Sequence, residues 1–169
     1  MPVTDLQFIA QRAHYNRDDY ESFRYYIEDD ARSDTELDAL VESIAAPIIA
    51  AIDCTACGNC CRSLDVYLTP DDAARLADGL NCSEDELRAR YIDHPRAQAE
   101  DEWGMLAARP CAFLKGNLCS VYAYRPQSCR DYPAFTPDFR WLAGDILGGV
   151  GLCPIIYNVI EALKYQTNW

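Results

Sequence analysis

The chain has 169 residues, of which 27 are acidic, 15 are basic and nine are cysteines, and its formal net charge is −12. This length is typical of one domain with an ordinary hydrophobic core, and the 50% hydrophobic content excludes wholesale disorder. The acidic balance excludes broad electrostatic binding to nucleic acid or to anionic membranes, because both need a basic surface.

The sequence also bears on the compartment of the protein. The first 25 residues contain no apolar run of signal-peptide length, and the apolar stretch at residues 44–52 is too short to span a bilayer. We therefore expect a cytoplasmic protein without a membrane segment. Thiols stay reduced in that compartment, so clustered cysteines indicate metal or redox chemistry.

Two segments of different character open the sequence. Thr4 and Gln7 match a capping box, so we expect a short helix to begin there. Residues 14–33 are polar and rich in tyrosine, which predicts irregular or weakly helical structure.

A longer helix is expected to follow. Ser33 and Glu36 match a second capping box, and apolar residues then recur three and four positions apart as far as Ile48. Pro47 lacks the N–H that a helix interior uses, so we expect it to kink or divide this helix.

Short elements alternate in the middle of the chain. Residues 63–68 alternate apolar and polar side chains, which predicts a strand. A threonine, a proline and two acids at residues 69–72 predict the start of a helix that ends at Gly79. A third capping box at residues 83–86 predicts another helix, which stops before His94.

Two further elements are expected toward the C-terminus. Two apolar runs flank residues 115–117, which predicts a β-hairpin. Residues 155–165 place apolar side chains on one helix face, and the glycine-rich residues 148–151 predict a turn. Together the elements predict a mainly helical α+β fold with a small β-hairpin, short strands and cysteine-bearing loops around a metal site.

We expect one compact domain with three parts. Residues 1–53 form an N-terminal helical segment packed on the core. Residues 54–154 form the metal-binding core that carries the cysteine cluster, and residues 155–169 form a C-terminal helix. The sequence has no internal repeat, low-complexity tract or linker that would separate these parts.

The densest cysteine pattern is Cys54-Thr55-Ala56-Cys57-Gly58-Asn59-Cys60-Cys61. Two residues between cysteines let a turn aim both thiolates at one point, and Gly58 permits the positive φ that such turns often require. The side chains of adjacent cysteines normally point apart, so Cys60 and Cys61 serve different sites or one of them is free. The pattern indicates metal binding without deciding which metal.

Four more cysteines of the pattern follow at wider spacing: Cys111, Cys119, Cys129 and Cys153. A C-x2-C-x2-C run with a remote Cys-Pro is similar to the bacterial ferredoxin pattern, although there the fourth cysteine follows within a few residues. Four thiolates hold Zn²⁺ or a 4Fe–4S cluster equally well, so the spacing does not decide the metal. Because the pattern has eight cysteines, it allows either one site or two sites. Cys82 lies outside the pattern and is interpreted as a small core residue.

The cysteines also have characteristic neighbours: Cys54-x2-Cys57-Gly58-x-Cys60-Cys61-Arg62, Cys111-x-Phe113-Leu114, Cys119-Ser120-Val121-Tyr122 and Arg125-Pro126-x2-Cys129-Arg130-x-Tyr132-Pro133. This set, over about residues 54–154, resembles the YkgJ-type cysteine-cluster family, which is described as a zinc- or iron-chelating domain. The resemblance implies a metal or iron–sulfur site built from Cys54, Cys57, Cys60, Cys61, Cys111, Cys119, Cys129 and Cys153. The motif also occurs in flagellin lysine N-methylases, which use S-adenosylmethionine.

Several arginines lie next to or near cysteines in this acidic chain, namely Arg62, Arg125 and Arg130. Guanidinium groups there would offset thiolate charge or bind an anionic substrate, and the alternative is that they are surface charges or pair with nearby acids. Arg130, Asp131 and Tyr132 lie within three residues of a cysteine. They are the candidate catalytic residues if a metal keeps an open position.

The leading functional hypothesis is a metalloprotein with a 4Fe–4S cluster that acts as a small enzyme or as an accessory factor, with a protein or small molecule as its partner. The first alternative is a structural zinc module for protein interaction. The second is S-adenosylmethionine-dependent lysine N-methylation, which the resemblance alone implies. A disulfide scaffold is disfavoured by the odd number of cysteines and by the adjacent pair.

Overall fold

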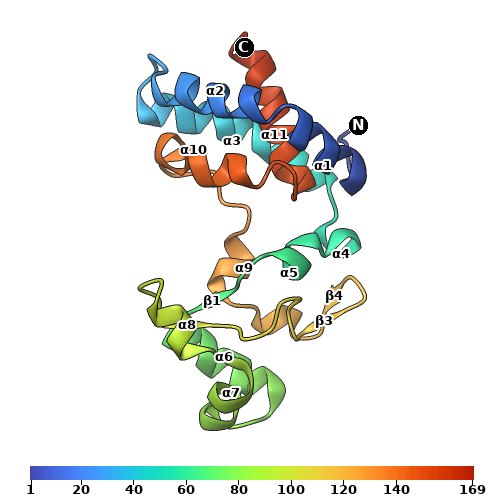
Figure 1. The fold of residues 1–169 in the computed structure, drawn as a ribbon, viewed down its shortest axis with the longest axis vertical. Coiled ribbons are helices and arrows are strands. Elements are labelled where there is room, and N and C mark those ends of the chain that lie inside the picture. The colour runs from blue at the N-terminus through green and yellow to red at the C-terminus, as the bar shows by residue number, and fades with distance from the viewer. The chain divides into compact units, whose positions relative to one another are not determined.

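The computed structural model describes residues 1–169 and confirms a mainly helical α+β fold with two small antiparallel strand pairs (Figure 1). The chain groups into two compact units: unit 1 comprises Met1–Asp53 and Pro133–Trp169, and unit 2 comprises Cys54–Tyr132. The sequence analysis grouped residues 133–154 with the cysteine-bearing core, and the structure packs them within unit 1. The expectation of one domain overall stays a prediction.

Unit 1 is a bundle of five helices: α1 (Leu6–Tyr15), α2 (Arg17–Glu28), α3 (Asp34–Ala51), α10 (Phe139–Gly148) and α11 (Pro154–Gln166). α10 packs on α2 and α3, while α11 packs on α3 and α1 (Figure 1). The first residues of the chain are fixed to α11, because Asn158 exchanges two hydrogen bonds of 2.8 Å with the backbone of Val3. No helix of the structure is both long enough and apolar enough to cross a membrane.

Two predictions for the start of the chain are wrong. The cap of α1 is Asp5 rather than Thr4, because the Asp5 carboxylate accepts hydrogen bonds from the N–H groups of Gln7 (2.9 Å) and Phe8 (3.0 Å). Most of residues 14–33 form the regular helix α2 rather than irregular structure. Its three buried residues, Tyr20, Phe23 and Ile27, lie on one face, and their burial stabilises a segment whose composition is otherwise polar.

The capping box of α3 is confirmed: Ser33 accepts a hydrogen bond from the N–H of Glu36, and the Glu36 carboxylate accepts one from the N–H of Ser33. Pro47 lies inside α3 and does not divide it. Burial of Ile44 and Ala45 just before the proline holds the helix against its neighbours, which compensates for one missing hydrogen bond.

Unit 2 consists of short elements: α4 (Cys54–Cys57), α5 (Asn59–Ser63), β1 (Tyr67–Leu68), α6 (Pro70–Leu80), α7 (Glu84–Tyr91), α8 (His94–Gln98), β2 (Gly104–Met105), β3 (Leu114–Lys115), β4 (Leu118–Cys119), the 3-10 helix η1 (Tyr122–Tyr124) and α9 (Gln127–Asp131). β1 pairs with β2, and β3 pairs with β4 in the register Leu114 to Cys119. The predicted hairpin is therefore confirmed, with Gly116 at a φ of 63° in its turn.

The helix predictions in unit 2 hold with small shifts at their ends. α7 begins with the expected capping box, and α6 begins at the expected Thr69 cap, which forms a capping box with Asp72. α6 ends at Leu80 rather than Gly79, because Asn81 takes the left-handed conformation that stops the helix. The strand predicted over residues 63–68 is wrong in extent: Ser63 ends α5, and only Tyr67 and Leu68 pair with another strand.

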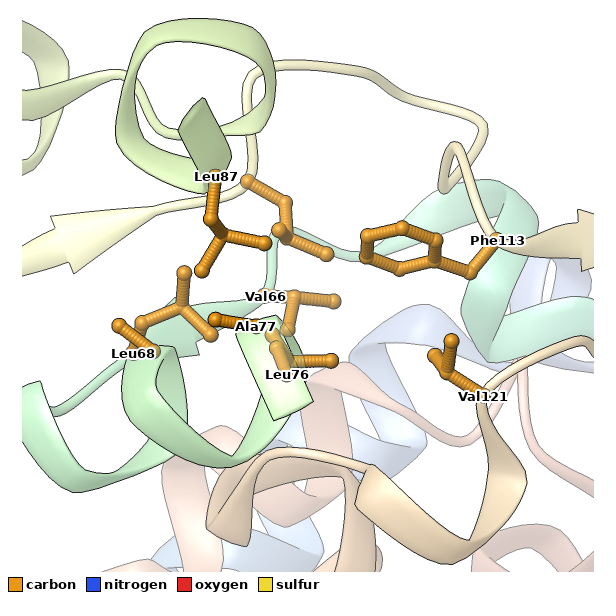
Figure 2. Packing of buried hydrophobic residues seen from close by; sticks show 9 residues of the cluster. Val66, Leu68, Leu76, Ala77, Leu87, Phe113 and Val121 are labelled. Carbon is orange, nitrogen blue, oxygen red and sulfur yellow. The ribbon is translucent and has the colours of Figure 1, made fainter. Parts of the chain in front are cut away.

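A small hydrophobic core holds unit 2 together. Figure 2 shows Leu68, Leu76 and Leu87 packed around Val66 and Ala77, with Phe113 and Val121 on the same cluster. Four cysteines pack against the edge of this cluster: Cys82, Cys111, Cys119 and Cys129. The core of unit 2 therefore brings distant cysteine-bearing segments together.

Candidate metal centre

The segment with the CxxC pattern, residues 54–63, which we call the CxxC loop, consists of the short helices α4 and α5 separated by Gly58. Gly58 has a φ of 62° and a ψ of 13°, a left-handed conformation that favours glycine. Its N–H donates to the Cys54 carbonyl at 3.2 Å, which closes the turn. A Cβ at this position would lie 3.2 Å from the backbone of Asn117, so the loop approaches the hairpin closely. The expectation that Gly58 provides a positive φ is confirmed.

A group of side-chain hydrogen bonds, which we call the Arg62–Asn117 clasp, joins this loop to the hairpin. Arg62 donates to the Cys57 carbonyl at 2.8 Å, to the Gly116 carbonyl at 2.9 Å and to the side-chain oxygen of Asn117. The Asn117 amide in turn donates to the Ala56 carbonyl at 2.8 Å. Because the guanidinium is planar and carries several donors, it can hold both backbones at once.

Backbone hydrogen bonds bring three cysteines into one region. The N–H of Cys111 donates to the Cys61 carbonyl at 2.8 Å, which connects α5 to the segment before the hairpin. Cys119 lies on β4 opposite Leu114, and the next residue, Ser120, donates to the Phe113 carbonyl. Segments that are about fifty residues apart in the sequence are therefore adjacent in unit 2.

Cys129 comes from α9, which two contacts hold in place. The N–H of Gln127 donates to a carboxylate oxygen of Asp72 at 2.9 Å. The Ser128 hydroxyl donates to the Tyr67 carbonyl on β1 at 2.8 Å. Both contacts attach the short helix to elements more than fifty residues earlier in the chain.

Four of the thiols interact electrostatically with one another, and we call Cys61, Cys111, Cys119 and Cys129 the four-thiol group. Burial raises the pKa of the Cys111 and Cys119 thiols, and proximity to Cys61 adds to both shifts. Burial raises the pKa of Cys129 to about 12, with contributions from the other three.

Cys61 differs from its three neighbours. The pKa of the Cys61 thiol is lowered to about 6, chiefly by a hydrogen bond with Cys60 and also by the positive charges of Arg125 and Arg62, against the opposing effect of burial. The Arg125 guanidinium lies 3.6 Å from the centroid of the Tyr122 ring, which fixes its position near the group. Cys61 is therefore the thiol of the group that most readily becomes a thiolate.

The chemistry of these four thiols fits a metal, although their side chains are not at metal-binding geometry in the structure. Four thiols, three of which pack against the core of unit 2, are the donors that Zn²⁺ and 4Fe–4S clusters use. No group of three or more His, Cys, Asp or Glu side chains lies at metal-binding geometry in the structure. The backbones of Cys61 and Cys111 and the start of α9 are held by the contacts described above.

Comparison with protein families decides the assignment. A family model named CxxCxxCC, with the description "Putative zinc- or iron-chelating domain", matches residues 53–145, more than half of the chain. The chain belongs to the CxxCxxCC family. This confirms the resemblance on which the sequence analysis drew. No curated protein and no solved structure matches the chain.

The other predicted ligands of this CxxCxxCC protein lie in different surroundings. Cys54 is exposed on α4, and Cys57 and Cys60 are half-buried on the same loop. Cys153 precedes α11 in unit 1, where it is 8% exposed, and it lies beyond the residues that the family model matches. The roles of these four cysteines as ligands stay predictions. Cys82 packs against the core of unit 2, in agreement with its interpretation as a core residue.

The predicted catalytic candidates support α9 in the structure. Arg130 donates to the side-chain oxygen of Gln127 and to the Arg125 carbonyl, and Asp131 accepts from the Gln127 amide at 2.6 Å. Tyr132 is the C-cap residue of α9. Their role in catalysis stays a prediction.

Sequence analysis missed the residues that position the thiols. Asn117 could have been noticed as the turn residue of the predicted hairpin, but nothing local indicates that it reaches Ala56. Asp72 was expected only as one of the acids at the start of α6, where it does complete the capping box, but its second contact with Gln127 depends on tertiary packing.

Proposed function

We propose that unit 2 binds a metal centre through the thiolates of Cys61, Cys111, Cys119 and Cys129, and that a 4Fe–4S cluster is its favoured occupant. The observation behind this proposal is that Cys111, Cys119 and Cys129 all pack against the hydrophobic core of unit 2, while the Cys111 N–H donates to the Cys61 carbonyl at 2.8 Å, so four separate segments of the chain bring these thiols into one region. Membership of a zinc- or iron-chelating family supports the same centre.

Charge near the group supports a thiolate-bound metal centre. A centre with four thiolate ligands carries net negative charge in a chain whose formal charge is already −12. Arg62 and Arg125 both act on Cys61 and would offset part of that charge. Such neighbouring charges tune the potential of a cluster. The ferredoxin-like C-x2-C-x2-C run, Cys54, Cys57 and Cys60, lies outside the four-thiol group, so its spacing bears on a second site rather than on this one.

Anaerobic purification of the full chain tests the proposal. We expect a brown protein with visible absorption, and with iron and acid-labile sulfide in equal amounts. Replacing any member of the four-thiol group by serine should abolish the bound iron. Cys82→Ser is the matched control, because this thiol packs on the same core outside the pattern and its loss should leave the iron unchanged. A colourless wild-type protein without metal would overturn the proposal.

A structural zinc site is the second candidate for the same thiols. The observation that favours it is the packing of Cys111, Cys119 and Cys129 against the core of unit 2, so a bound metal would also stabilise the fold. In that case the purified protein is colourless with one equivalent of zinc, and a chelator unfolds unit 2. A second equivalent of metal would indicate that Cys54, Cys57 and Cys60 contribute to another site.

We extend this proposal to the role of the whole protein. A small enzyme or accessory factor in the cytoplasm would use the centre together with a protein or small-molecule partner. Lysine N-methylation with S-adenosylmethionine stays a prediction of the family resemblance alone. Calorimetry of the metal-loaded protein with S-adenosylmethionine tests it, and an absence of binding heat would count against it.

A further inference from the structure

Asp72 is almost fully buried, with 4% of its surface exposed, and its two carboxylate oxygens serve different helices. Oδ2 accepts hydrogen bonds from the N–H (3.1 Å) and the hydroxyl (2.9 Å) of Thr69, which closes the N-terminus of α6. Oδ1 accepts from the N–H of Gln127, the first residue of α9. One buried carboxylate therefore joins the start of α6 to the start of the helix that carries Cys129.

α9 has no local cap at its N-terminus. The helix has only five residues, and its N-cap residue, Pro126, makes no side-chain capping hydrogen bond. A helix this short is not stable by itself, because nucleation costs more than its few hydrogen bonds contribute. The Asp72 carboxylate thus supplies from a distant part of the sequence the acceptor that an N-cap side chain normally provides.

α6 supports the rest of the same segment as well. A Cβ on Gly79 would lie 2.4 Å from the Tyr124 ring, so η1 packs directly on the helix backbone. Leu76 of α6 and Val121 belong to one hydrophobic cluster (Figure 2). The segment that leads into α9 is therefore fixed on α6 at Val121, Tyr124 and Gln127. The contact of Asp72 with Gln127 is the one of these three that is nearest to Cys129 in the chain.

We propose that Asp72 is a positioning residue of the metal centre, which fixes Cys129 relative to the other three members of the four-thiol group. Cys129 lies in the same helical turn as Gln127, so the hydrogen bond between Asp72 and Gln127 sets where this turn begins. This inference rests on the proposed metal-binding function. According to this inference, the metal centre needs Asp72 in addition to its four cysteine ligands, although Asp72 does not itself bind the metal.

A pair of substitutions at Gln127 separates the backbone contact from the side chain. Gln127→Pro removes the N–H that Asp72 receives, while proline suits the first position of a helix and leaves the α6 cap intact. Gln127→Ala removes only the side-chain bonds with Arg130 and Asp131 and is the matched control. Both variants are prepared as the full chain and compared with the wild type.

Two measurements report on the position of Cys129. Zinc affinity is measured by competition with a chromophoric chelator, and Gln127→Pro should lower it roughly ten- to hundredfold relative to Gln127→Ala, as losses of outer-shell partners do. In metal-free protein, mass spectrometry compares the rate of alkylation of Cys129 with that of exposed Cys54. Gln127→Pro should raise this ratio severalfold, since Cys129 loses its burial, and Gln127→Ala should not.

A second pair tests Asp72 itself. Asp72→Asn removes the shared carboxylate, and Glu86→Gln removes the corresponding carboxylate of the α7 capping box, which has no link to another helix. Both should lower the thermal midpoint, but only Asp72→Asn should lower zinc affinity and raise Cys129 alkylation.

The outcomes distinguish this inference from the proposed function. Equal zinc affinities and alkylation ratios in Gln127→Pro and Gln127→Ala would overturn the positioning role. Failure of the wild type to bind zinc or iron would overturn the proposed function. The alkylation ratio in metal-free protein would then still show whether Asp72 fixes Cys129, because it needs no metal.

Discussion

Arg62 and Asn117 are joined by a side-chain hydrogen bond across 55 residues of sequence, and the bond connects the CxxC loop to the tip of the hairpin. Each residue also binds the backbone of the opposite segment: Arg62 contacts the Gly116 carbonyl and Asn117 contacts the Ala56 carbonyl. The loop that carries Cys61 and the hairpin that carries Cys119 are therefore held as one body. In the proposed metal centre, this connection would fix the segment with Cys61 relative to the hairpin with Cys119.

Asn117→Ala should weaken this connection without altering a thiol. The variant loses two hydrogen bonds of the clasp, and a typical intramolecular hydrogen bond contributes about 0.5–1.5 kcal/mol. We expect a loss of about 1–3 kcal/mol in the free energy of unfolding, measured with urea, together with weaker zinc binding. Lys115→Ala in the same hairpin is the control. Equal losses in the two variants would show that the clasp does not stabilise unit 2.

Gly58→Ala and Gly116→Ala form a matched pair. Both glycines have φ near +60°, so an alanine at either position costs about 1–2 kcal/mol in backbone strain. A Cβ at Gly58 also meets the Arg62 guanidinium and the Asn117 backbone at 3.2 Å, whereas one at Gly116 meets nothing within 4 Å. We expect Gly58→Ala to destabilise the protein more and to lower metal affinity. Denaturant titration and zinc competition measure both effects, and a larger loss at Gly116 would contradict this interpretation.

The parts of the fold that sequence analysis predicted correctly depend on local patterns. The capping boxes at Ser33, Thr69 and Ser83 are each completed within four residues, so the sequence alone contains all their partners. The hairpin was also predictable, since its short apolar runs flank a glycine that can adopt a positive φ.

Elements stabilised by distant partners were missed. The start of α10 receives its cap from Asp38 on α3, whose carboxylate accepts from the N–H groups of Asp138 and Phe139 at 2.8 Å. The sequence around Asp38 and the sequence around Asp138 give no sign of this contact, because the two segments are about a hundred residues apart. The same holds for the candidate site: the cysteines were visible as a pattern, but their grouping depends on contacts such as that between Cys111 and Cys61.

Acid should reduce stability through Glu36. The Ser33 hydroxyl, and then its backbone N–H, hold the pKa of the Glu36 carboxyl below its usual value. A carboxyl whose pKa is lower in the folded state contributes stability above its unfolded pKa of about 4.3, and this contribution is lost as the pH falls through the folded pKa.

Glu36→Gln tests this pH dependence. Its stability deficit relative to wild type should be present at about pH 6 and should shrink toward pH 3, measured by urea unfolding at several pH values. Glu42→Gln, on the exposed side of the same helix and outside the capping box, is the control. A deficit for Glu36→Gln that does not change with pH would contradict the prediction.

Arg140 on α10 closes the C-terminal end of α2. Its guanidinium donates to four backbone carbonyls at the end of α2 and in the following loop: those of Ile27, Glu28, Asp30 and Arg32. Its Nε also donates to the Asp34 carboxylate at 2.6 Å. The side chain is only 16% exposed, so water cannot readily replace these bonds.

Arg140→Lys should therefore destabilise unit 1 although it keeps the charge. Lysine has one compact donor group and cannot reach both sides of the loop, so we expect a loss of about 2–3 kcal/mol in the free energy of unfolding. Arg88→Lys is the matched control, because its one ion pair with Glu84 is exposed and 3.4 Å long, and it should change stability by less than about 0.5 kcal/mol. Urea titration measures both variants. Hydrogen exchange should show that the loss at Arg140 is local, with faster exchange in α2, and a uniform change across both units would contradict a capping role.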